Sequence, residues 1–128
     1  MKQEHKELLL KDLCSRLPYR VKLRCYSNSI MCVGPYTLDT ITLDRIFNKH
    51  TEYVPTIDEV KPYLFPMSSM TEEQKEEYRS LQQKVNNSKG LINSDVMEYV
   101  NWCYKNHIDI NNLIPLGLAI DATGLNIY

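Results

Sequence analysis

The spacing of the apolar residues changes its period at Pro18, and this change constrains the fold more than any other feature of the chain. Before Pro18, from about Glu4 to Leu17, leucines recur every three or four residues, as they do on one face of a helix. The predicted inner face consists of Leu9, Leu10, Leu13, Cys14 and Leu17, and the predicted outer face mostly of Lys6, Lys11, Asp12 and Arg16. A proline ends this helix, because it pushes the residue before it out of the helical region.

After Pro18 the period falls to two, which is typical of a half-buried strand. Val21, Leu23 and Cys25 alternate with Lys22, Arg24 and Tyr26. Asn28 and Ser29 are residue types that favour turns, and they predict a hairpin that leads to a second strand over 30–33. That register places Leu23 opposite Gly34 and Cys25 opposite Cys32.

The next segments predict the rest of a small sheet. Residues 36–43 are rich in β-branched side chains and predict a third strand. For residues 43–48 a helical turn and a fourth strand both remain open. Residues 52–63 predict a short edge strand or a single helical turn, because prolines stand at 55 and 62. A stiff connector over 62–66 would follow.

The second half of the chain predicts helices. Thr71-Glu72-Glu73-Gln74 is a capping box and predicts a helix that runs to about Val85. A second helix is expected from about Asp95 to Lys105, with Val96, Val100, Cys103 and Tyr104 on its inner face. The apolar tail, 108–128, is expected to dock on the core, with a short helix that ends at Gly117.

These elements define an α+β fold: an N-terminal helix, a small antiparallel β-meander of three or four strands, then two or three C-terminal helices. No linker or internal repeat divides residues 1–128, so we expect a single domain. No apolar run is long enough to span a membrane or to serve as a signal peptide. We therefore expect a cytoplasmic protein whose four cysteines are thiols, most of them buried.

Charge gives only a weak indication of a partner. The net charge is −1, but residues 1–50 carry +4 and residues 51–128 carry −5. Such a split is compatible with a basic and an acidic face, or with two halves that attract each other.

Three segments of the chain resemble short uncharacterised proteins of Bacteroides-type gut bacteria and of their phages or mobile elements. They are Leu-Lys-Asp-Leu-Cys-Ser-Arg-Leu-Pro-Tyr at 10–19, Lys-Pro-Tyr-Leu-Phe-Pro-Met-Ser-Ser-Met-Thr-Glu-Glu at 61–73 and Gly-Leu-Ala-Ile-Asp-Ala at 117–122. The middle segment is the most specific of the three. The resemblance implies a bacterial or phage context and implies no activity.

The sequence predicts neither a catalytic site, nor a cofactor, nor a metal site. It contains no nucleophile elbow and no phosphate-binding glycine loop. Cys103 and His107 have ligand spacing, but two ligands do not make a zinc site. His50-Thr51-Glu52 matches half of a zinc deaminase motif, and the cysteine half is missing.

Two groups of residues are candidates for binding. Arg20, Lys22, Arg24 and Tyr26 are expected on the outer face of the first strand, where they could bind a nucleic-acid backbone, although an ordinary solvated face is the simpler account. Tyr99, Trp102 and Tyr104 are a candidate protein interface, although packing against the tail is a simpler account.

The function that the sequence favours is a small, non-enzymatic protein-interaction module of phage or mobile-element origin. The alternative is a nucleic-acid-binding accessory protein that uses the basic strand face. An enzyme without a recognisable motif comes last. Partner identity and oligomeric state stay open at this stage.

Overall fold

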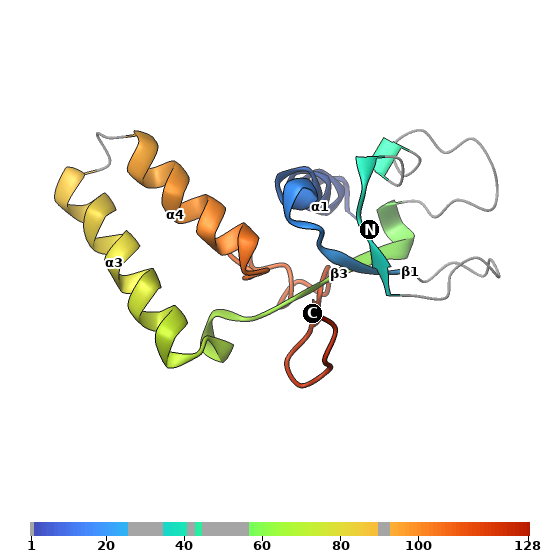
Figure 1. Ribbon diagram of the computed structural model, residues 1–128. Helices are drawn as coiled ribbons and strands as arrows, with labels where there is room; N and C mark the ends of the chain where they lie inside the picture. The colour runs from blue at the N-terminus through green and yellow to red at the C-terminus, as the bar shows by residue number, and fades with distance from the viewer. Residues whose placement is uncertain (1, 26–34, 41–42, 45–56, 90–92) are drawn as a thin grey trace.

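A computed structural model describes residues 2–25, 35–40, 43–44, 57–89 and 93–128 of the chain. Helix α1 (Gln3–Arg16) packs on a sheet of four strands, and helices α3 (Glu72–Ser88) and α4 (Asn93–Lys105) form an antiparallel pair to one side (Figure 1). The fold is α+β, as the sequence predicts, with two C-terminal helices in the described ranges. None of the helices in those ranges combines the length and apolar character that crossing a membrane requires.

Helix α1 confirms the predicted span but corrects its predicted faces. Leu9 and Leu13 are fully buried, as expected from their spacing. Asp12 and Arg16, however, are also fully buried, whereas Cys14 is exposed. The buried face of α1 therefore includes residues that were predicted on its outer, polar face. The reason is tertiary: the groups that pair with Arg16 and Asp12 come from the loop after α4, about 90 residues away in sequence.

The sheet has the strand order β2-β1-β3-β4, with β1 (Lys22–Cys25), β2 (Tyr36–Thr37), β3 (Val60–Leu64) and β4 (Ile120–Asp121). Strand β1 runs antiparallel to β2 and to β3, while β4 runs parallel to β3. The sheet is thus mixed rather than an antiparallel meander. A parallel neighbour needs a long crossover, which here consists of α3, α4 and the tail.

The predicted register of β1 was wrong by two residues. Leu23 lies opposite Tyr36 of β2, not opposite Gly34. A shift of two keeps every side chain on its face, so Val21 and Leu23 are still buried. Strand β2 ends at Thr37, and Thr40 and Asp44 are helical, so the third strand is shorter than predicted. The turn at 28–29 and the strand at 30–33 lie outside the described residues.

The predicted helical turn is present as a short 3-10 helix, η2 (Ile57–Glu59), but the strand that follows it, β3, lies inside the sheet and not at its edge. Pro62 is opposite Leu23 of β1, and the pairing with β4 begins one residue later, at Tyr63. The missing N–H of Pro62 therefore falls where the pairing with β4 has not yet started. The predicted connector over 62–66 begins inside this strand, and Phe65 continues it with a bridge to Ile108.

The tail docks on the core, as predicted, but it forms turns instead of a short helix. Gly117 has φ +74° and donates its N–H to the Ile114 carbonyl at 3.0 Å, while Leu118 N–H reaches the Leu113 carbonyl at 2.9 Å. This is the hydrogen-bond pattern of a Schellman turn, which requires the left-handed residue. It places Leu113 and Leu118 in the core with Leu9 and Leu23.

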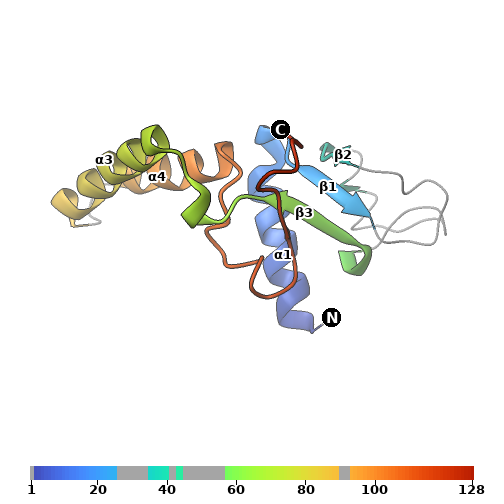
Figure 2. The same cartoon turned by 90° about the horizontal axis from the view of Figure 1, so that it is seen from below.

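The α3–α4 pair stands apart from the layer of α1 and the sheet. Figures 1 and 2 both show α3 as the helix farthest from the sheet. Thr71 caps α3 with the predicted capping box: its Oγ1 accepts from Gln74 N–H at 3.1 Å, and Gln74 Oε1 accepts from Thr71 N–H at 3.0 Å. In α4, the buried residues are Cys103 and Tyr104, which lie in its last turn.

Candidate interaction site on the helical hairpin

Three aromatic side chains meet between α3 and α4, and we call them the aromatic seam: Tyr78, Tyr99 and Trp102. The ring centroids of Tyr78 and Tyr99 are 5.5 Å apart and those of Tyr78 and Trp102 are 6.1 Å apart, both pairs tilted. This tilted geometry is favourable for aromatic pairs. All three side chains are partly exposed, so the seam joins the two helices and also forms part of the surface.

Hydrogen bonds fix the polar ends of the seam. The hydroxyls of Tyr78 and Tyr99 are 2.9 Å apart, and Gln82 Nε2 donates to the Tyr78 hydroxyl at 3.2 Å. Trp102 Nε1 donates to Glu77 Oε2 at 2.7 Å. Burial, followed by the hydrogen bond with Tyr78, raises the pKa of Tyr99 above its ordinary value. The Tyr99 phenol is therefore neutral and can act as a hydrogen-bond donor.

A small hollow opens beside Tyr99. It has a volume of about 230 Å³ and is lined by Gln82, Val85, Asn86 and Tyr99. Gln82 and Asn86 are exposed at its rim, and Val85 and Tyr99 are half-buried. Pockets for small-molecule ligands usually measure roughly 300–1,000 Å³. The size of this hollow suits one side chain of a partner, with amide groups at the rim to bond its backbone.

Charged residues divide α3 into two sides. Arg79, Gln82 and Asn86 follow one another at spacings of three and four, so they share the face that carries the hollow, and Lys89 follows at the left-handed C-cap of the helix. Glu77 lies beside Trp102, from whose Nε1 it accepts a hydrogen bond. Lys84 forms an exposed ion pair with Glu98 of α4 at 3.5 Å, across the two helices.

The structure separates the three aromatic residues that the sequence grouped as an interface. Tyr99 and Trp102 contact Tyr78 of α3. Tyr104 is buried on another side of α4, where the Arg16 guanidinium carbon lies 4.8 Å from its ring centroid. Residues two apart on a helix do not face the same way. Tyr78 and Gln82 were not predicted as site residues, although the helical spacing of Tyr78, Leu81 and Val85 was a usable signal for the first of them.

The candidate nucleic-acid residues are only partly brought together. Arg20 precedes β1 in a left-handed conformation with φ 56° and is exposed, as is Arg24. Lys22 is half-buried, and its Nζ donates to Thr37 Oγ1 at 2.5 Å. Tyr26 lies outside the described residues. The predicted basic face thus has two exposed arginines, with a lysine between them that is bonded to β2.

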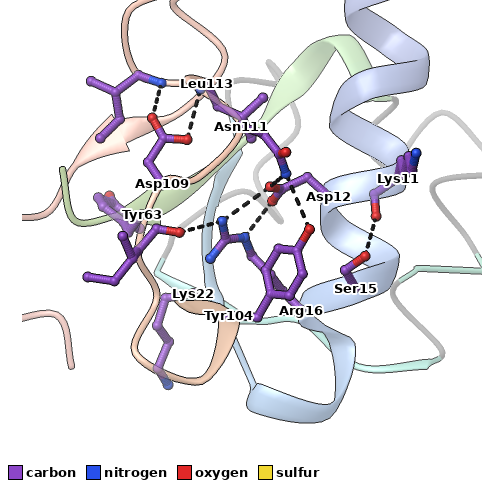
Figure 3. A network of polar contacts seen from close by, with 12 residues as sticks. Lys11, Asp12, Ser15, Arg16, Lys22, Tyr63, Tyr104, Asp109, Asn111 and Leu113 are labelled. Atoms are coloured by element: carbon purple, nitrogen blue, oxygen red, sulfur yellow. Dashed lines mark hydrogen bonds and ion pairs between the residues drawn. The ribbon is translucent and has the colours of Figure 1, made fainter. Parts of the chain in front are cut away.

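A buried polar network that is structural in character lies between α1, the end of α4 and the segment that follows α4 (Figure 3). Arg16 joins Asp12, the Ile108 carbonyl and the Tyr104 ring, and Asn111 Nδ2 donates to Asp12 Oδ2 at 2.8 Å. Asp109 lies nearby and accepts from the backbone N–H groups of Leu113 and Ile114, both at 2.8 Å.

Cys103 and His107 have metal-ligand spacing, but the residues that the structure describes bring no third ligand to them. Burial raises the pKa of the Cys103 thiol to about 11, so it stays protonated. Burial, and then the charge of Arg16, lowers the pKa of His107 to about 4. Within the described part of the chain, no group of three or more histidine, cysteine or acidic residues could hold a metal ion.

Comparison of the chain with protein-family models, with curated proteins and with solved structures finds no match.

Proposed function

We propose that this protein is a non-enzymatic protein-interaction module, and that its partner binds the aromatic seam and the adjoining hollow. The observation that carries the proposal is the hollow of about 230 Å³ beside Tyr99, on a helical pair whose outer helix is far from the sheet. A site of this size is too small for most free ligands and suits an anchor side chain of a protein.

The seam also has the energetic properties of a binding surface. Tyrosine and tryptophan side chains have few rotatable bonds, so they lose little conformational freedom on binding. The hydrogen bonds among Tyr78, Tyr99 and Gln82 already fix their orientation in the free protein. A partner would therefore meet a preorganised surface, which lowers the entropic cost of association. The bacterial, phage-related and cytoplasmic setting is proposed from the sequence resemblance alone.

Two adjacent asparagines allow a matched test. Asn86 lines the hollow, whereas Asn87 is exposed and does not line it. Asn86→Trp should fill the hollow, and Asn87→Trp adds the same side chain outside it. In affinity capture from the source cells, wild type and Asn87→Trp should retain a common partner that Asn86→Trp loses. Equal capture by all three proteins would contradict the proposal, provided that circular dichroism shows each variant folded.

The alternative function, nucleic-acid binding, is supported by the exposure of Arg20 and Arg24. The bond between Lys22 and Thr37 weakens it, because that ammonium group would have to give up a protein partner. The test is retention on DNA and RNA at several salt concentrations, with the variant Arg20→Ala/Lys22→Ala/Arg24→Ala beside wild type. Retention that the variant loses would favour the alternative.

A further inference from the structure

Two cations flank the hollow along one face of α3. Arg79 precedes Gln82 by three residues, and Lys89 follows Asn86 by three. At a rise of 1.5 Å per residue, their backbone positions are separated by about 15 Å along the helix. Both side chains are exposed, and the two residues lie before and after the lining residues of α3 along the helix.

These two cations are also the basic residues of α3 and its cap that lack a partner. Lys75 pairs with Glu72 at 3.2 Å, and Lys84 pairs with Glu98 at 3.5 Å. Among the residues that the structure describes, the side chains of Arg79 and Lys89 make neither a hydrogen bond nor an ion pair. Three residues before Gln82 and three after Asn86, α3 and its cap thus carry two positive charges without a partner among the described residues, on a chain whose net charge is −1.

We infer that the occupant of the hollow is an acidic segment of a protein, with one apolar side chain between carboxylates. This inference rests on the proposed function and adds the chemistry of the partner. Val85 and Tyr99 would contact the apolar side chain, and the amides of Gln82 and Asn86 would bond the backbone around it. Arg79 and Lys89 would pair with the flanking carboxylates and set the orientation of the segment.

A nucleic acid fits the same face less well. Its backbone carries a charge at every nucleotide and requires a continuous row of cations, whereas this face offers one at each end. The four glutamates in the first two turns of α3 (Glu72, Glu73, Glu76 and Glu77) would repel a polyanion that extended along the helix. The rings of Tyr78 and Tyr99 already contact each other, which leaves them poorly placed to stack on bases.

The test uses a short synthetic peptide with one leucine between glutamates, and a counterpart with lysines in place of the glutamates. Titration into the ¹⁵N-labelled full chain at low salt should shift the amide signals of Gln82, Val85, Asn86 and Tyr99 with the glutamate peptide alone. The double variant Arg79→Glu/Lys89→Glu should weaken this binding about tenfold or more. The control Lys2→Glu/Lys11→Glu changes the net charge equally, at exposed lysines of α1, and should bind within about twofold of wild type.

Three outcomes would overturn the inference: no localised shifts with the glutamate peptide, equal binding of the lysine peptide, or tighter binding of a single-stranded oligonucleotide at the same amides. Each leaves the proposed function testable by itself. If Asn86→Trp loses its captured partner while Arg79→Glu/Lys89→Glu keeps it, the hollow binds a protein, and the inference that the partner segment is acidic is wrong. If Asn86→Trp keeps the partner, the proposed function fails as well.

Discussion

Asp12 and Arg16 form an ion pair one turn apart on α1, with Arg16 Nε 2.5 Å from Asp12 Oδ1 and both side chains fully buried. The guanidinium also donates to the Ile108 carbonyl at 2.7 Å, so the pair ties α1 to the segment that follows α4. A buried ion pair contributes little by itself, because desolvation offsets the attraction, but breaking it leaves one charge buried without its partner.

Removing Arg16 should therefore destabilise the protein far more than removing an exposed cation. We expect Arg16→Met to lower the free energy of unfolding by about 3–5 kcal/mol, since Asp12 keeps a buried charge. Lys75→Met, which breaks the exposed pair with Glu72, should cost less than about 1 kcal/mol. Urea unfolding measures both. The double variant Asp12→Leu/Arg16→Met should recover part of the loss. If its loss equalled the sum of the losses of Asp12→Leu alone and Arg16→Met alone, this account would be contradicted.

The hydroxyl of Tyr128 bridges β1 and β3, and its removal should weaken the contact between the tail and the sheet. It accepts from Lys22 N–H at 2.8 Å and donates to the Tyr63 carbonyl at 2.7 Å. Tyr128→Phe keeps the ring, which stacks on His107 with centroids 3.8 Å apart, and removes both bonds. We expect a loss of about 1–2 kcal/mol in urea unfolding. Tyr19→Phe, at a partly exposed position, serves as the control and should change stability little.

Stability should fall as the pH is lowered from about 7 to 5, because of His107. Its folded pKa is about 4, below the ordinary 6.5, so the unfolded chain binds more protons between these values. Stability therefore rises with pH across this window and is lost as pH falls through it. After discounting for solvent screening, we expect His107 to lower the free energy of unfolding at pH 5 by about 1 kcal/mol relative to pH 7. His107→Asn suits the left-handed backbone at φ 59° and should flatten the slope between pH 7 and 5. An unchanged slope would show that another group is responsible.

Cys14 and Cys103 should differ strongly in their reaction with a thiol reagent. Cys14 is exposed on α1, whereas Cys103 is fully buried and its pKa is raised to about 11 by burial. Only the thiolate is nucleophilic, so the native protein should react rapidly at Cys14 and slowly at Cys103. Peptide mapping after brief treatment with iodoacetamide measures both sites at once. Denaturation in urea should remove the difference, and equal native rates would contradict the burial of Cys103.

The elements that local physics specifies were predicted well. The leucine spacing of α1, the proline after it, the alternation around Leu23 and the capping box at Thr71 each act within a few residues. Such features are largely independent of the rest of the chain, so a helix, a strand and a helix start can be placed from the sequence. Even the wrong register of β1 kept Leu23 buried, because the pleat repeats every two residues.

The candidate site could be predicted only in part. Tyr99 and Trp102 were identified from their residue types, but Tyr104 was wrongly grouped with them and Tyr78 was missed. Their separation depends on which side of α4 meets α3 and which meets α1. The hollow beside Tyr99 depends on the same packing, since Gln82 and Asn86 come from one helix and Tyr99 from the other.

The sequence by itself therefore determined the class of the fold, the span of α1 and the start of α3, because periodicity, capping and proline act locally, whereas α3 continues to Ser88, beyond its predicted end at Val85. Only the tertiary structure decided that Asp12 and Arg16 are core residues, that Pro62 lies inside the sheet and that β4 runs parallel to β3. Each of these depends on a partner far along the chain, such as Ile108 for Arg16 or Ile120 for Tyr63. A buried charge is tolerated only where a distant partner supplies its hydrogen bonds, and an interior proline only where no neighbouring strand needs its missing N–H. No local pattern in the sequence encodes that partner.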